Sequence, residues 1–243
     1  MSYKEDSLSK DYSQKEMILE YTKDKSVFYS YEKFKYDSLV ARNEKPPITN
    51  QAGFDYDFMV VKQKLNIEKY TILLNNLYRI SYNIKLDWNI TKDKIKIGNY
   101  NCQKAILNYK GRTWEAWFTN DIPIFDGPYI FSGLPGLIVQ MNDKRKDYIF
   151  SLIGLKKSED SYALNELKIK PIPVNEKQLR KVMLDHYNDP FREMKTSNSK
   201  SRWLDENGKE FTPDFNELTK NEQESIKKYN NPIELSDAIQ YPK

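Results

Sequence analysis

The sequence contains very few of the side chains that build metal and disulfide sites. It has one cysteine, Cys102, and one histidine, His186. A lone cysteine cannot form a disulfide within the chain, and most zinc and copper sites require several cysteine or histidine ligands. We therefore predict no intramolecular disulfide, no metal and no cofactor. One cysteine does not identify the redox compartment.

The sequence also lacks long apolar runs and an excess of one charge. Runs such as Phe58 to Val61 and Leu134 to Val139 are far shorter than the roughly 20 residues that span a bilayer. The 39 basic and 35 acidic residues are interspersed, giving a net charge of +4, and nothing in them points to a nucleic-acid partner. The polar start has no signal-peptide core, so the protein is either cytoplasmic or a processed form.

Motifs for catalysis and nucleotide binding are missing as well. The eight glycines fit no phosphate loop or dinucleotide fingerprint, and no nucleophile motif accompanies His186. An enzyme remains an alternative, as a hydrolase or thiol-dependent activity built on Cys102 and His186. Lys104, two residues beyond Cys102 on a strand, would share its face and favour the thiolate. The simpler interpretation is a buried structural cysteine and a structural or exposed histidine.

Aromatic residues are abundant and favour β-structure. The chain has 18 Tyr, 11 Phe and 4 Trp, which suit the pleated surface of a sheet. We predict a hairpin over 17–22 and 26–31, a loop over 37–54, and antiparallel strands in the list that follows. The predicted strands are 56–62, 69–74, 78–84, 86–91, 94–97, 102–109, 113–119, 137–141, 147–156 and 162–169.

The last third of the chain changes to a helical pattern. Asn175 and Gln178 form a capping-box signature, which predicts a helix over about 175–188. A second helix, capped by Thr219, is predicted over 219–229, with a charged loop over 192–216 between them. The predicted fold is mainly β: a strongly curved antiparallel sheet or half-barrel with a few C-terminal helices. Residues 1–16 form a flexible terminus and 17–243 a single β-rich domain.

The segment from Arg112 to Thr119 alternates with a period of two. Trp114 and Trp117 then lie on opposite faces of the strand, so one can line the core while the other lines a second surface. The simpler interpretation is that both cover edges of the core. Arg112 is expected to bind turn carbonyls, Glu115 or Asp126.

Unusual backbone chemistry is concentrated in 121–136, which holds three prolines and three glycines. Prolines remove ladder donors and glycines permit tight turns, so this stretch is expected to be an ordered connection. Gly133 and Gly136 bracket Leu134 and Pro135, so that Leu134 is pressed inward. The motif is either a structural element closing one end of a sheet or a ligand cradle.

The segment Gly133-Leu134-Pro135-Gly136-Leu137-Ile138 resembles the signature of the GLPGLI family of secreted proteins. Flanking segments are similar too, including Tyr100 to Ala105, Ala116 to Thr119 and Asn231 to Leu235. The resemblance implies an envelope protein of a Gram-negative bacterium, located in the periplasm or at the outer-membrane surface, whose signal peptide has been removed. It implies no biochemical role.

These observations lead to a functional hypothesis of a non-catalytic cell-envelope protein. It would bind an outer-membrane protein or act as an accessory subunit of an outer-membrane complex. The alternative is a carrier of an apolar ligand or lipid in the sheet concavity, by analogy with periplasmic lipoprotein carriers. The predicted binding residues are Arg112, Trp114, Trp117, Phe131, Leu134 and Pro135.

Overall fold

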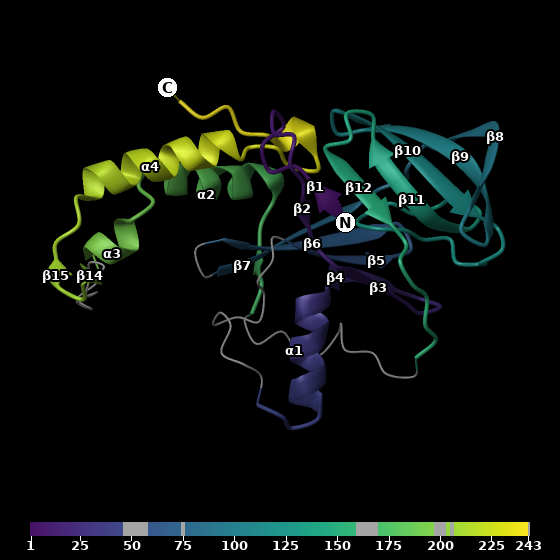
Figure 1. Ribbon diagram of the computed structural model, residues 1–243, viewed down its shortest axis with the longest axis horizontal. Helices are drawn as coiled ribbons and strands as arrows, with labels where there is room; N and C mark the ends of the chain where they lie inside the picture. Colours follow the sequence, from purple (N-terminus) through teal and green to yellow (C-terminus); the bar gives the residue numbers. More distant parts are fainter. Residues whose placement is uncertain (46–57, 74–75, 159–169, 197–202, 205–206, 243) are drawn as a thin grey trace.

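The fold is built from two β-sheets that face each other, with helices at their margins (Figure 1). This computed structural model describes residues 1–45, 58–73, 76–158, 170–196, 203–204 and 207–242. The predicted mainly β class with antiparallel pairing is confirmed. The strands divide between two sheets instead of forming one curved sheet.

The first sheet has seven strands, all paired antiparallel. The order across it is β2 (Ser13–Gln14), β1 (Ser2–Tyr3), β12 (Tyr148–Ser151), β11 (Leu137–Asp143), β10 (Arg112–Thr119), β9 (Tyr100–Tyr109) and β8 (Asn89–Ile97). β8 is therefore an edge strand. It merges the two strands predicted over 86–91 and 94–97.

The second sheet has six strands. Its order is β13 (Ile172–Pro173), β7 (Asn76–Asn83), β6 (Asn66–Leu73), β5 (Met59–Gln63), β4 (Ser26–Ser30) and β3 (Met17–Tyr21). The predicted hairpin is β3–β4, and only β13 pairs in parallel. A separate pair joins β14 (Trp203–Leu204) to β15 (Glu210–Phe211). The predicted strand over 162–169 lies outside the described residues.

Both sheets contribute to one central core. Phe28, Val60 and Ile67 from the six-stranded sheet pack in the same cluster as Trp114 and Phe150 from the seven-stranded sheet. Neighbouring residues in β4 and β5, such as Val27 and Val61, point the other way into a second cluster. The six-stranded sheet is thus buried on both faces, because apolar residues occupy successive positions of its central strands.

The second cluster is completed by α1 (Tyr31–Ala41), whose Phe34 packs against it. Figure 1 shows α1 below β3 and β4. The sequence predicts a loop from residue 37, whereas α1 runs to Ala41. Ser30 starts the helix, since its side chain accepts the Lys33 N–H. The rest of that predicted loop, from 46, lies largely outside the described residues.

The C-terminal helices lie to one side of the sheets (Figure 1). α2 (Glu176–Asn188) has the predicted capping box of Asn175 and Gln178. α4 (Phe215–Lys228) begins four residues before the predicted Thr219, because Asp214 accepts the first free N–H groups. The remaining short helices are α3 (Arg192–Thr196), within the predicted charged loop, and η1 (Leu235–Asp237). Within the described ranges, no helix is long and apolar enough to cross a membrane.

The N-terminal residues join the seven-stranded sheet, in contrast to the flexible terminus expected for 1–16. Tyr3 pairs with Tyr148 across β1 and β12, and the two rings stack. The Met1 amino group donates to the Lys15 carbonyl oxygen at 2.8 Å. The sequence does not predict this pairing, because β1 is only two residues long and the surrounding segment is rich in charged residues.

Candidate functional site on the seven-stranded sheet

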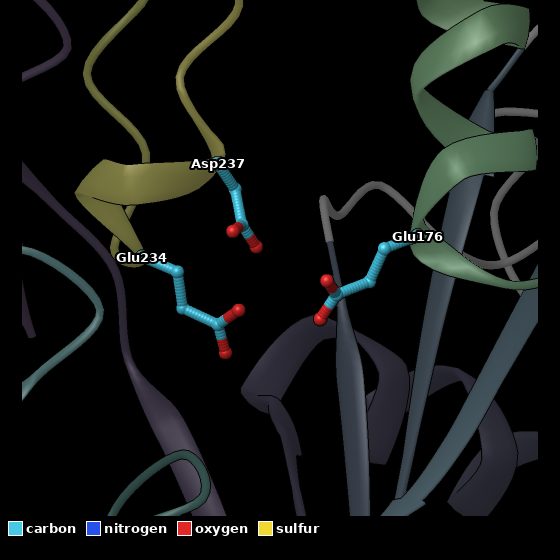
Figure 2. A group of neighbouring side chains, drawn as sticks. All are labelled: Glu176, Glu234 and Asp237. Carbon is cyan, nitrogen blue, oxygen red and sulfur yellow. The ribbon is translucent and has the colours of Figure 1, made fainter.

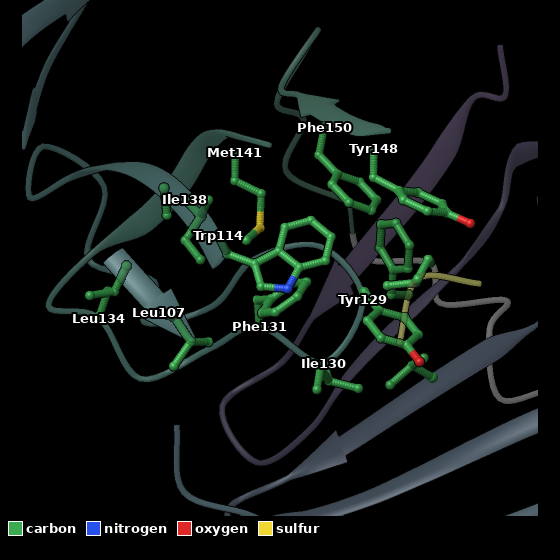
Figure 3. Packing of buried hydrophobic residues seen from close by; sticks show 14 of the residues in the cluster. Leu107, Trp114, Tyr129, Ile130, Phe131, Leu134, Ile138, Met141, Tyr148 and Phe150 are labelled. Carbon is green, nitrogen blue, oxygen red and sulfur yellow. The ribbon is translucent and has the colours of Figure 1, made fainter. Parts of the chain in front are cut away.

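The predicted binding residues separate into a buried group and a surface group. Trp114, Phe131 and Leu134 are almost completely buried, and the Trp114 and Phe131 rings lie 4.7 Å apart between centroids (Figure 3). Arg112 is buried as well, whereas Trp117 is half-buried and Pro135 is exposed. The four buried residues build the core, so they are not accessible to a ligand. Trp114, Phe131 and Leu134 belong to the core cluster to which both sheets contribute.

Arg112 is the centre of a buried polar network. Its guanidinium donates to Asp143 and Asp147 at 2.9 Å each, and to the Asn231 side chain at 2.6 Å. It also donates to the Ile233 and Pro232 carbonyl oxygens. Neither predicted carboxylate partner, Glu115 or Asp126, takes part. Arg112 thus fixes the C-terminal segment against the β11–β12 turn, which sequence spacing does not reveal.

Asp126 pairs instead with Lys62 from β5. The Lys62 ammonium binds the Asp126 carboxylate and also donates to the Gly127 carbonyl oxygen at 2.6 Å. Both side chains are buried. Burial lowers the pKa of Lys62, against the opposing effect of Asp126. This pair attaches the proline-rich connection to the six-stranded sheet.

The two glycines of the hexapeptide have different structural roles. A Cβ at Gly136 would lie 2.0 Å from the Thr119 carbonyl oxygen, so only glycine fits there. Gly133 has a positive φ of +89° but open space around it. The Gly136 N–H donates to the Leu134 carbonyl oxygen, and Leu134 is pressed into the core as expected. The motif therefore packs the connection against β10, consistent with a structural element.

The other face of the seven-stranded sheet, here called the outer face, is formed by half-buried side chains of β9, β10 and β11. Along β10 the residues alternate between buried and half-buried, and Trp117 belongs to the second set. The described helices pack elsewhere, α1 on β3 and β4, and α2 on α4. The residues that define the outer face are Lys104, Ile106, Glu115, Trp117, Gln140 and Asn142.

Trp117 lies at the middle of this face and is flanked by a charge pair. The Lys104 ammonium lies 5.8 Å from the centre of the Trp117 ring and 2.8 Å from the Glu115 carboxylate. Gln140 is the cross-strand neighbour of Trp117 on β11. The face thus presents an aromatic ring, a residue type enriched in protein interfaces, among paired charges and amides.

Cys102 and His186 are not brought together. Cys102 lies on β9 and His186 on α2, in different parts of the molecule (Figure 1). Cys102 is 2% exposed, and burial raises the pKa of its thiol, which disfavours the nucleophilic thiolate. The Nδ1 atom of His186 has no hydrogen-bond partner among the described residues. The geometry gives no support to a Cys–His pair.

Three carboxylates converge where the C-terminal segment meets α2: Glu176, Glu234 and Asp237 (Figure 2). Lysines already neutralise them, since Lys110 binds Glu176 and Asp237 while Lys69 binds Glu234 at 2.7 Å. Glu234 also accepts the Tyr129 hydroxyl at 2.8 Å, and burial raises its pKa. These ion pairs hold the C-terminal segment against α2 and the strands, and we call the group of Glu176, Glu234, Asp237, Lys69 and Lys110 the C-terminal clamp.

A groove of about 560 Å³ lies at the end of β8 and β9. Its apolar lining residues are Ile95, Cys102 and Phe118. The remaining lining residues are Lys94, Lys96, Asn101, Gln103, Asn120 and Asp121. Sequence reasoning missed this groove, because it depends on which strand forms the sheet edge.

Comparison with known proteins gives a short family match. Residues 107–140 match a family described as "Protein of unknown function (Porph_ging)". This stretch contains the hexapeptide and all six predicted binding residues. No curated protein matches the chain.

Solved structures with similarity include two of PNGF-II, in space groups C2 and P21. They are 17% and 18% identical to this chain, with TM-scores of 0.49 and 0.46. Each alignment covers 71% of this chain. The chain spans 30% of the length of these structures.

Proposed function

We propose that this protein is a non-catalytic binding protein of the cell envelope, and that its outer face binds an outer-membrane protein. The observation that carries the proposal is the half-buried Trp117 at the centre of the outer face, away from the contacts that the described helices α1, α2 and α4 make. Placement in the envelope rests on the resemblance to the GLPGLI family. That the partner is an outer-membrane protein is part of the proposal.

The composition of the outer face favours a protein over a lipid as the partner. Lys104 and Glu115 neutralise each other, and Gln140 and Asn142 offer amide groups that can pair with a polar surface. Tryptophan is among the residues most enriched at the anchors of protein interfaces. A lipid would require a continuous apolar surface, whereas the outer face carries Lys104 and Glu115 beside its aromatic ring.

The proposal is tested by placing a photo-crosslinking amino acid at position 117 in the full chain and irradiating it with the native envelope fraction. The control position is Tyr229, which is 48% exposed at the end of α4. We expect a discrete adduct with one outer-membrane protein from position 117 and none from position 229. Equal adducts from both positions, or none, would contradict the proposal.

The partner recovered in this way is then purified for a binding measurement. Trp117→Ala should weaken binding roughly 30-fold, the loss of about 2 kcal/mol typical of an interface anchor. Thr113→Ala is the matched control on the same strand and face, and it should change the affinity little. An unchanged affinity of Trp117→Ala would assign the interface to another surface.

A further inference from the structure

The edge strand β8 offers backbone groups to a partner. It is nine residues long and ends the order of the seven-stranded sheet, paired only with β9 within the described sheets. None of its residues is buried. A strand at the edge of a sheet exposes a row of N–H and C=O groups, which can pair with one further extended chain.

Two lysines near the end of β8 carry positive charge along this strand. Lys94 and Lys96 line the groove together with their cross-strand partners Gln103 and Asn101 on β9. The groove lies on the paired side of β8, so the opposite edge of the strand is the one that can accept a further chain. An extended segment added at that edge would lie next to the same two lysines.

The charges of this edge select the occupant. Lys94 and Lys96 face a single lining carboxylate, Asp121, whose Oδ2 already accepts the Asn101 N–H at 3.1 Å. Lys92 and Asp93 precede them on the same strand, so β8 carries three lysines and one aspartate and is positive overall. A second copy of β8 would bring lysines against lysines, so self-pairing is disfavoured. An acidic segment is complementary instead.

We infer that β8 binds an extended acidic segment of the partner protein, which adds an eighth strand to the sheet. This inference rests on the proposed function and specifies the chemistry of the partner. Glutamate or aspartate at alternate positions of the segment would face Lys94 and Lys96, since both strands repeat every two residues. The alternate apolar side chains would lie next to Ile95, which is 44% exposed.

The test uses a capped octapeptide of alternating glutamate and valine, titrated into the full chain and followed by amide NMR. We expect the shifts to concentrate on Asn89–Ile97 and amide exchange there to slow. Lys94→Glu combined with Lys96→Glu should weaken binding about tenfold or more, because it reverses the charge that attracts the peptide. The matched control, Lys177→Glu with Lys181→Glu on α2, changes the net charge equally and should leave the affinity unchanged.

Two peptide controls complete the design. An alternating lysine–valine peptide should not bind, and a glutamate–valine peptide with N-methylated backbone groups should lose most of its affinity, since it cannot form strand hydrogen bonds. Equal binding of the methylated peptide, binding outside β8, or no binding would each overturn the inference. If the peptide does not bind while the position-117 adduct still forms, only the inference about β8 is wrong. If the peptide binds while no adduct forms, the proposal that the outer face binds the partner is wrong.

Discussion

The two faces of β10 are built from neighbouring residues but serve different purposes. Arg112, Trp114, Ala116 and Phe118 are buried between the sheets, whereas Glu115 and Trp117 lie on the outer face. Two tryptophans three positions apart therefore have opposite environments. Side chains of a strand alternate between its two faces. The same residue type is therefore buried at one position and lies on the surface at a position an odd number of residues away.

The largest expected effect comes from removing the core tryptophan. Trp114→Ala should lower the free energy of unfolding by about 3–5 kcal/mol, because it leaves a cavity against Phe131 and Phe150. Trp117→Ala should cost less than about 1 kcal/mol, as expected for a surface position. Urea unfolding of the two variants measures both. Similar losses would break the comparison between the faces.

The next effect concerns how the proline-rich connection packs on β10. Gly136→Ala should destabilise the fold by roughly 3 kcal/mol, since its Cβ would collide with the Thr119 backbone. Gly133→Ala meets open space and should cost only about 1–2 kcal/mol, for its positive φ. Thermal or urea unfolding distinguishes them. A larger loss at Gly133 would indicate that backbone angle, not close approach, explains the motif.

A smaller effect concerns the pH dependence of stability at the C-terminal clamp. Burial raises the pKa of Glu234 above its usual 4.5, so the folded state holds the Glu234 proton more tightly than the unfolded state. The contribution of Glu234 to stability is therefore largest below pH 4.5 and declines as the pH rises through its folded pKa. We expect the stability of the wild type relative to Glu234→Gln to fall between pH 4.5 and pH 7.

Urea unfolding of both proteins across this pH range measures the difference directly. Carboxylates that do not contact Glu234 are the same in both proteins and cancel in the comparison. Asp237 is the exception, because contacts with Glu234 and Lys110 outweigh burial and lower its pKa. The double variants with Asp237→Asn in both backgrounds remove this contribution. A relative stability that rises with pH would show that Lys69 dominates over burial at Glu234.

Sequence periodicity predicted local structure well. The two-residue period of a strand predicts that Trp114 and Trp117 lie on opposite faces. The three-residue spacing of Asn175 and Gln178 predicts the capping box. The start of α4 was misplaced because Thr219 and Asp214 are both good N-cap residues, and Asp214 forms the cap. Local sequence signals predict that a helix forms, but they do not determine its first residue where two residues can each act as the N-cap.

Long-range relations could not be read from the sequence. The division into two sheets, the edge position of β8 and the pairing of Lys62 with Asp126 depend on strand order. Lys62 and Asp126 are 64 residues apart, and no local pattern connects them. The predicted binding set was accordingly mixed. Trp117 lies on the outer face, whereas Arg112, Trp114, Phe131 and Leu134 are occupied by packing and buried contacts.

The Arg112 network has a consequence for the order in which the protein is assembled. Asp143 and Asp147 emerge from the ribosome soon after Arg112, but Asn231 follows it by 119 residues. Until then the guanidinium lacks the partners that seal it from water. Contacts of such sequence separation are slow to form. The two sheets can therefore pair early, while closure around Arg112 waits for the C-terminal segment.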